Sequence, residues 1–392
     1  MDSLYVHLFF GFTIRVIFIT YGIIQDSISE VQFTDIDYKV FTDAARNIIK
    51  GGSPYDTATY RYPPLIAVLM IPNVLYHPCF GKILLSFIDL AVYYLLCRIL
   101  ALQGLTKERS KRFALVWLYN PLSIVITTRG NADSVSAFFV ILTLYFFNRK
   151  WFSWAGVVHG IAVHIRLYPI VFSLPLYISI IDSHENKFIQ MLFPNKSRIL
   201  FVASCALAFA GQTGLCYLLY GYEFLYESFL YHLTRIDIRH NYSVYFYLNY
   251  LNYGSDPILV NKVITLLPIV VLLLALAYFY STPRHLAFCE MSMAFVLVMF
   301  NSVVTCQYFI WYLSLLPLCL PKMTCSWKEL FLVSNFWFAS QAAWLLPAYL
   351  LEFKSMDTYL YIWIQCLVFF WANVIVLTSF IRSYDVKKVK SK

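Results

Sequence analysis

LYVHLFFGFTIRVIFITYGII, residues 4–24, is the stretch from which the fold class follows. It is long enough to cross a bilayer as one helix, because a helix rises about 1.5 Å per residue and the hydrocarbon core is about 30 Å thick. It lacks a small-residue cleavage site, so we interpret it as an uncleaved first span. Similar apolar runs recur along the whole chain, of which 60% is hydrophobic and 13% charged. The sequence therefore predicts an all-α polytopic membrane protein and excludes a soluble globular domain.

The apolar runs predict a single integral membrane domain over residues 1–392 with about 12 membrane segments, within a range of about 10–13. The predicted spans are residues 4–24, 83–102, 113–128, 135–147, 152–164, 168–181, 199–220, 258–280, 286–305, 309–320, 330–350 and 359–381. Several are too short to cross alone. We expect these to be tilted, re-entrant or extended by polar ends buried against protein.

The distribution of basic residues predicts the orientation. Most lysines and arginines outside the spans fall on the face that also holds both termini, and this face is therefore expected to be cytosolic. The net charge of +9 is thus explained by the basic residues on the cytosolic face of a membrane protein, and no nucleic-acid partner is expected. The basic tail, residues 382–392, has Lys388 and Lys390 in the spacing of a dilysine retrieval signal, although a stop-transfer flank would also be basic. We expect an endoplasmic reticulum membrane protein with cytosolic termini.

Two large loops fall on the opposite, lumenal face, at residues 25–81 and 221–257. The first contains the carboxylate pair Asp35 and Asp37 at the start of an amphipathic helix that Gly51 and Gly52 end. Asp37 stands where a helix N-cap belongs, and the helix could lie on the membrane surface. A carboxylate pair just outside a bilayer favours chemistry on a lipid-linked substrate, most simply sugar transfer, in which a base removes the proton of the attacking hydroxyl.

A departing phosphate needs cations rather than an acid. The candidate substrate-binding residues on the lumenal face are Arg61, Arg129, His164, Arg166, Arg239 and His240. Plainer interpretations are a hairpin charge for Arg129, a snorkelling arginine for Arg166 and an aromatic belt for the tyrosines around Arg239 and His240. Asp89 and Arg98 share one span but lie on opposite sides of its helix, so each is expected to have a partner on another helix. The nine cysteines have no CxxC spacing, and no metal site is predicted.

These motifs together resemble the catalytic subunit family of glycosylphosphatidylinositol (GPI) mannosyltransferase I. The matching stretches are TDIDYKVFTDAARNI from Thr34, SPYDTATYRYPPL from Ser53, RGNADS from Arg129, HIRLYPI from His164, FLYHLTRIDIRHNYSVYFYLNYL from Phe229 and QYFIWYLSLLPL from Gln307. They follow the family's order over almost the whole chain. HIRLYPI departs mildly, because the family often has lysine there, and Tyr62-Pro63-Pro64 stands where the family usually reads Tyr-Thr-Pro.

The resemblance implies a GT-C type glycosyltransferase fold with lumenal loop helices. It implies inverting transfer of the first mannose, in α-1,4 linkage, from dolichyl-phosphate-mannose to glucosaminyl-(acyl)phosphatidylinositol at a lumenal active site. It also implies a small endoplasmic reticulum membrane subunit that stabilises the catalytic chain. The family's DxD motif corresponds to Asp35 and Asp37, and we expect Asp35 to be the base and Asp37 to orient it or cap the helix. No cofactor is expected; a divalent metal is possible but not expected, because arginines can neutralise the departing phosphate.

Three other functions fit the sequence less well. A different dolichyl-phosphate-mannose-dependent mannosyltransferase would share the lumenal carboxylates, and only the family motifs argue against it. A membrane transporter or scramblase would use charges at the bilayer midplane and inverted repeats, whereas the charges here gather on the lumenal side. A non-catalytic membrane subunit would tolerate the change Asp35→Asn.

Overall fold

The computed structural model describes residues 3–181, 194–234, 241–252 and 259–384, and within them the chain is helical without a β-strand. The α-helices are α1 (Ser3–Ile28), α2 (Ile36–Ile49), α3 (Pro64–Leu69), α4 (Ile71–Leu75), α5 (Phe80–Leu102), α6 (Lys107–Leu118), α7 (Pro121–Thr128), α8 (Asp133–Asn148), α9 (Phe152–Ile165), α10 (Ser173–Ser179), α12 (Lys196–Leu225), α13 (Tyr231–Thr234), α14 (Phe246–Leu251), α15 (Leu259–Tyr280), α16 (Leu286–Met299), α17 (Ile310–Leu313), α18 (Leu316–Cys319), α19 (Trp327–Lys354) and α20 (Tyr359–Ser383). Short 3₁₀ and π turns join several of them, among them η3 (Tyr226–Leu230). Arg239, His240 and the tail with Lys388 and Lys390 lie outside the described residues.

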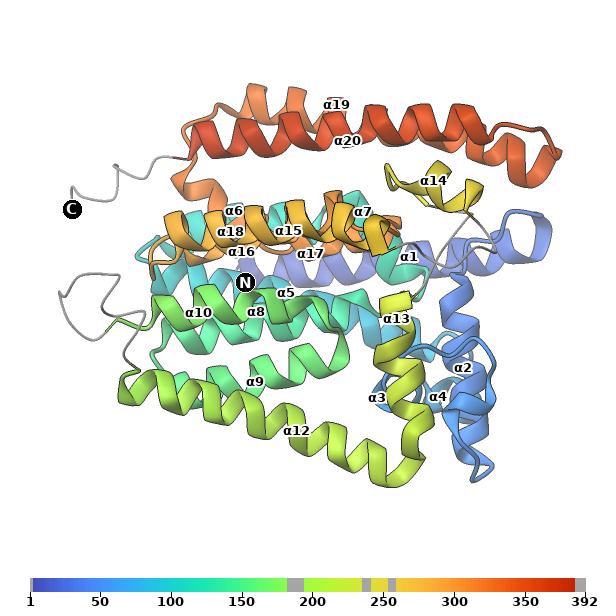
Figure 1. The fold of residues 1–392 in the computed structure, drawn as a ribbon, viewed down its shortest axis with the longest axis horizontal. Helices are drawn as coiled ribbons and strands as arrows, with labels where there is room; N and C mark the ends of the chain where they lie inside the picture. Colours follow the sequence, from blue (N-terminus) through green and yellow to red (C-terminus); the bar gives the residue numbers. More distant parts are fainter. Residues whose placement is uncertain (1–2, 182–193, 235–240, 253–258, 385–392) are drawn as a thin grey trace.

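The long helices run side by side, and α2, α3, α4 and α13 gather at one end of them (Figure 1). The helices α19 and α20 form a pair that crosses the top of the view, and α12 runs along the bottom. The first large loop supplies α2, α3 and α4, and the second supplies α13. Both loops that the sequence assigns to one face therefore lie at the same end of the bundle.

The helices agree with the predicted polytopic membrane protein, but several predicted spans have other limits. Among the described residues, four helical segments are long and apolar enough to cross a bilayer: α1, α5, α20 and the continuous stretch Lys196–Leu230. Shorter apolar helices accompany them, such as α8, α9 and α16. The predicted span 113–128 is two helices, α6 and α7, because Asn120 caps α7 and Pro121 cannot continue the hydrogen bonding of α6. The segment 309–320 is a series of short turns rather than one span. The total of about 12 segments stays a prediction.

A buried ion pair joins α1 to α5. The Arg15 guanidinium donates to Asp89 at 2.8 Å from Nε, and both side chains are fully enclosed. Arg15 also donates to the carbonyl oxygens of Gly11 and Leu118. The expectation that Asp89 pairs with another helix is confirmed. The same expectation for Arg98 is wrong, because its exposed side chain lies over the ring of Tyr94 on its own helix.

The first large loop folds back on itself. Phe41, Ala44 and Ala45 on one face of α2 are fully buried. The helix packs against α3, α4 and the turn that follows Ser53. It ends at Lys50, and Gly51 then takes a positive φ of 81°, which suits glycine at this position. The apolar face of α2 is thus covered by protein, whereas the sequence suggested that it could lie on the membrane surface.

The two large loops also pack against each other. The Tyr55 hydroxyl lies 2.8 Å from Ser228 Oγ, and Ser228 Oγ donates to the carbonyl oxygen of Tyr62. Arg61 forms an ion pair with Glu227 on η3. The first loop is therefore held between the bundle and the second loop.

The helix α9, which ends just before Arg166, packs closely against α12. A Cβ atom added to Gly156 or Gly160 would come within 2.3 Å or 2.4 Å of a backbone oxygen of α12. Glycines four residues apart let two helix backbones approach in a membrane. The end of α9, where Arg166 follows, is therefore tied to α12.

We predict that Asp89→Leu destabilises the protein, because it leaves the buried Arg15 charge without its partner. Breaking a buried ion pair from one side costs about 3–5 kcal/mol. The measurement is the thermal unfolding midpoint of the purified protein in detergent. The control, Arg98→Met, removes an exposed arginine from the same helix and should leave the midpoint unchanged. An Asp89→Leu midpoint equal to that of the control would contradict the prediction.

Candidate active site

The carboxylate pair lies where the first large loop meets the turn after α7. The Asp35 backbone N–H donates to the carbonyl oxygen of Arg129 at 2.9 Å. Asp35 is the N-cap of α2, and its carboxylate accepts a hydrogen bond from the backbone N–H of Asp37 at 3.1 Å. The prediction that Asp37 stands at the N-cap is therefore wrong by two residues. The helix starts two residues earlier than expected, at Ile36, because the Asp35 side chain satisfies an N–H group of its first turn.

Asp37 lies in the first turn of α2, half-buried and close to Asp35. Its carboxylate accepts a hydrogen bond from the Tyr62 hydroxyl at 2.7 Å. Burial, followed by the negative charge of Asp35, raises the pKa of Asp37 to about 6. The Tyr62 hydrogen bond and the nearby Arg166 charge act in the opposite direction. Asp37 is therefore still largely ionised at neutral pH, and its raised pKa suits a general base.

Arg166 and Asp133 form a buried ion pair beside Asp37. Arg166 Nε lies 3.1 Å and its terminal nitrogen 3.3 Å from the two Asp133 oxygens, which is a bidentate contact. Trp311 Nε1 donates to the same carboxylate at 3.3 Å. Asp133 begins α8, Arg166 follows α9 and Trp311 lies on α17, so the pair joins three segments far apart in the chain.

Aromatic rings enclose this ion pair. The Arg166 guanidinium lies 5.1 Å from the centre of the Tyr62 ring and 5.7 Å from that of Tyr308. Trp311 stacks on Tyr168 with ring centres 4.0 Å apart, and on Tyr308 at 4.5 Å. Such a wall can pack against the apolar face of a sugar and also excludes water, which strengthens the charges inside it.

Arg129 has a different environment from Arg166. Its Nε atom is buried and has no hydrogen-bond partner, and no ion pair joins its side chain to another described residue. Its electrostatic neighbours are Lys82, Cys306 and Tyr242. A buried donor without a partner is costly, which marks this position as one that an anion would stabilise.

Two other predicted residues are engaged elsewhere. Arg61 is paired with Glu227 and lies 4.3 Å from the centre of the Tyr231 ring. His164 is buried against α12, where its Nδ1 lies 3.2 Å from Thr213 Oγ1. The structure therefore brings together Asp35, Asp37, Arg129 and Arg166, but not the side chains of Arg61 and His164.

The site predicted from the sequence lacks Asp133, Tyr62 and Trp311. Each of these residues lies inside one of the stretches that resemble the family: RGNADS, SPYDTATYRYPPL and QYFIWYLSLLPL. A carboxylate at the start of an apolar segment is costly without a partner, and this cost could have pointed to Asp133. Nothing in the sequence pairs Asp133 with Arg166 or Trp311. No three His, Cys, Asp or Glu side chains in the described ranges are grouped as metal ligands.

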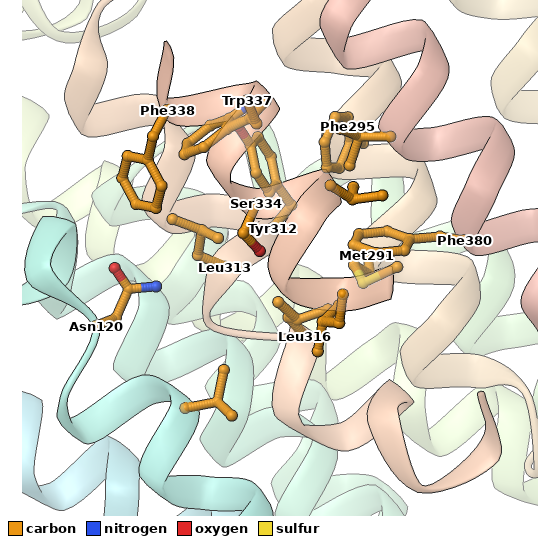
Figure 2. A pocket seen from close by; sticks show the side chains of 14 residues that line it. Asn120, Met291, Phe295, Tyr312, Leu313, Leu316, Ser334, Trp337, Phe338 and Phe380 are labelled. Carbon is orange, nitrogen blue, oxygen red and sulfur yellow. The ribbon is translucent and has the colours of Figure 1, made fainter. Parts of the chain in front are cut away.

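An apolar pocket of about 110 Å³ lies on another side of α17 (Figure 2). Its lining residues are Val116, Asn120, Met291, Phe295, Tyr312, Leu313, Leu316, Leu330, Val333, Ser334, Trp337, Phe338, Val376 and Phe380. Trp311 of α17 faces the ion pair, whereas the next residue, Tyr312, lines the pocket. The short helix α17 thus separates the polar site from an apolar space beneath the α19–α20 pair.

Comparison with known proteins identifies the family. The model of the family described as "Mannosyltransferase (PIG-M)" matches residues 126–381. The chain is 40% identical to GPI mannosyltransferase 1 of Dictyostelium discoideum, over 97% of this chain and 91% of the relative. The chain belongs to the PIG-M mannosyltransferase family. It is also 38% identical to the GPI alpha-1,4-mannosyltransferase I catalytic subunit of Danio rerio and 35% identical to GPI mannosyltransferase 1 of Saccharomyces cerevisiae, each over at least 94% of both chains.

Membership of the PIG-M family makes this protein a glycosyltransferase, as the sequence predicted. It argues against the transporter and the non-catalytic subunit. The family match starts at residue 126 and so includes Arg129, Asp133, Arg166 and Trp311, but it does not reach Asp35 or Asp37. The pairwise matches, which cover nearly the whole chain, extend over the first loop as well.

We predict that Asp133→Asn lowers the mannosyltransferase activity by about 10²-fold, because it removes the charge that holds Arg166 and a misplaced site group costs that much. The measurement is the transfer rate in membranes, normalised to the amount of protein. Glu352→Gln, which changes an exposed carboxylate near the end of α19, is the control. Equal activity of the two variants would show that the ion pair is dispensable.

Proposed function

We propose that this PIG-M family member transfers the first mannose, in α-1,4 linkage, from dolichyl-phosphate-mannose to glucosaminyl-(acyl)phosphatidylinositol. The observation that carries the proposal is the carboxylate pair of Asp35 and Asp37, the latter with its raised pKa, beside Arg129, whose buried Nε has no hydrogen-bond partner among the described residues. A base and an anion site together are what transfer from a sugar phosphate requires. The relative named GPI alpha-1,4-mannosyltransferase I catalytic subunit supports the linkage, and the relatives named GPI mannosyltransferase 1 support the acceptor class.

Asp37 is the base in this proposal, although the sequence favoured Asp35. Its pKa of about 6 makes it a suitable proton acceptor near neutral pH, and Tyr62 holds one of its oxygens. Asp35 instead caps α2, and its charge contributes to the raised pKa of Asp37. The acceptor 4-hydroxyl oxygen attacks C1 of mannose while its proton passes to Asp37. The bond between C1 and the phosphate oxygen breaks on the opposite face, so a β-linked donor gives an α-linked product.

The leaving dolichyl phosphate takes the electron pair of the broken bond, and Arg129 is the residue that we assign to it. Arg166 and Arg61 are each neutralised by a carboxylate, whereas the Arg129 guanidinium is not paired within the described part of the chain. Arg166 orients the site through Asp133 and the aromatic wall. Arg239 and His240 stay candidates for the acceptor phosphate. With Arg129 on the donor phosphate, the reaction needs no divalent metal, and chelation by EDTA should leave the rate unchanged.

The cellular setting is part of the same proposal. We infer a GT-C type fold with about 12 membrane segments, cytosolic termini and a site that faces the endoplasmic reticulum lumen. The gathering of α2, α3, α4 and α13 at one end of the bundle supports a common face for the two large loops. A small membrane subunit that stabilises the chain is expected as partner, and the two lipid substrates would enter from the bilayer.

We predict that this chain restores GPI synthesis in cells that lack the first GPI mannosyltransferase, because it carries the whole site. Labelled lipids should show conversion of glucosaminyl-phosphatidylinositol to its mannosylated product. Vector-only cells are the control, and the small subunit is supplied in a parallel culture. Good expression without conversion in either culture would refute the proposed acceptor or reaction.

We predict that Asp37→Asn lowers the transfer rate by about 10²–10⁴-fold, the usual contribution of a general base. Asp35→Asn should have a smaller effect, because an amide oxygen can still cap α2. Both rates are measured in the complemented cells' membranes and normalised to protein amount. A larger loss in Asp35→Asn than in Asp37→Asn would return the role of base to Asp35.

We predict that kcat/KM falls about tenfold per pH unit below pH 6, because the active, ionised form of Asp37 is lost as the pH falls through its raised pKa. The measurement is the rate at low donor concentration between pH 5 and pH 8. In Tyr62→Phe the hydrogen bond that lowers the Asp37 pKa is missing, so the acidic limb should move to higher pH. A profile that Tyr62→Phe leaves in place would contradict this assignment.

A further inference from the structure

Three side chains outside the proposed chemistry hold the segment directly before the carboxylate pair. Thr34 precedes Asp35, and its hydroxyl donates to Asp26 and accepts a hydrogen bond from Lys82 Nζ at 2.6 Å. Asp26 lies near the end of α1, and Lys82 lies at the start of α5. A single hydroxyl thus links two opposite charges from two different helices.

Asp26 also binds the backbone of this segment. Its Oδ1 atom accepts the backbone N–H of Phe33 at 2.6 Å and that of Thr34 at 3.1 Å. On the other side, the next backbone N–H, that of Asp35, donates to the Arg129 carbonyl oxygen. Three consecutive N–H groups are therefore occupied by fixed partners on α1 and the turn after α7.

Lys82 is 3% exposed, so its ammonium is enclosed by protein. Its ammonium donates to the neutral Thr34 hydroxyl, and its charge lies within electrostatic range of both Asp26 and Asp35. An ion pair between Lys82 and Asp35 would draw the carboxylate away from α2. The Thr34 hydroxyl instead holds the ammonium, and Asp35 remains free to cap the helix and face Asp37.

We propose that Asp26, Thr34 and Lys82 are positioning residues for mannosyl transfer, which set the place of Asp35 and Asp37 through the Thr34 hydroxyl. This inference rests on the proposed function of the same site. None of the three needs to touch a substrate, and their effect passes through the backbone at Asp35. Displacing a reacting group by about 1 Å costs about 10²-fold in rate, so small movements of this segment are enough.

The first test replaces Thr34 by residues of similar size. Thr34→Val removes both hydrogen bonds, and we expect kcat per enzyme molecule to fall about 10²-fold with the donor KM within about threefold of wild type. Thr34→Ser keeps the hydroxyl and should restore kcat to within about threefold. The matched control is Thr57→Val, which removes a hydroxyl that accepts from Asn47 elsewhere in the same loop.

The second test is a double-mutant cycle. Asp26→Asn should lower kcat on its own, because it disturbs the contact with the Thr34 hydroxyl while its amide oxygen can still accept the backbone N–H groups of Phe33 and Thr34. Asp26→Asn with Thr34→Val should therefore have the kcat of Thr34→Val alone. Multiplying effects would mean independent roles and would overturn the proposal. Turnover in Thr34→Val equal to that in Thr57→Val would overturn it as well.

All rates are measured in membranes of the complemented cells, with the enzyme quantified in each sample. If the wild-type chain does not convert glucosaminyl-phosphatidylinositol, the proposed function itself fails. The wild-type chain could instead convert the lipid while Thr34→Val lowers only the amount of folded enzyme and leaves the turnover per molecule normal. In that case the hydrogen bonds of Thr34 are structural, and the positioning role alone is refuted.

Discussion

The ion pair between Arg166 and Asp133 is the contact on which the arrangement of the site depends. Two charges buried among apolar helices are tolerable only when they satisfy each other with good geometry. Here the bidentate contact does so, and Trp311 supplies a further hydrogen bond. Asp133 begins α8, Arg166 follows α9 and Trp311 lies on α17, so these contacts add a polar link between three segments that also pack against one another. Tyr62 then brings the first loop onto the guanidinium.

Arginines that are paired with a carboxylate stabilise the fold, whereas an arginine without such a partner is available to bind a substrate. Arg15, Arg61 and Arg166 each have a carboxylate partner, and each joins elements distant in the chain. Arg129 has no such partner in the part of the chain that the structure describes, and its buried Nε is unsatisfied. In a medium of low dielectric constant an unpaired cation attracts an anion strongly. Electrostatics act in the same way on Asp37, because its burial and then the negative charge of Asp35 raise its pKa.

The first loop is held in place by hydrogen bonds and an ion pair to several other parts of the molecule. It binds α1 and α5 through Asp26 and Lys82, the turn after α7 through Asp35, and the second loop through Tyr55 and Arg61. A loop that carries catalytic groups must hold them within a fraction of an ångström, and side-chain hydrogen bonds to its backbone achieve this without a β-sheet or disulfide. The carboxylates therefore sit on a fixed part of the molecule, although they lie outside the helical bundle.

The sequence by itself determined the class of the protein, the helix α2 with its glycine end, and the carboxylate pair. These are local properties: apolar run length, helical periodicity and adjacent residues are read directly from the chain. It also placed Arg129 and Arg166 among the candidates, because charges next to apolar segments are costly. It misplaced the N-cap by two residues, since Asp35 and Asp37 are equally good caps by composition.

Only the tertiary structure decided which charges meet. Asp89 pairs with Arg15 across 74 residues, Arg166 with Asp133 across 33, and Arg61 with Glu227 across 166. These partners follow from the packing of helices that have similar apolar surfaces, and no periodicity in a single chain specifies them. Once they are paired, Arg129 is distinguished from the other arginines, and Tyr62 is placed on Asp37. The sequence thus supplied the chemical groups, and the fold decided which were neutralised and which were left to act.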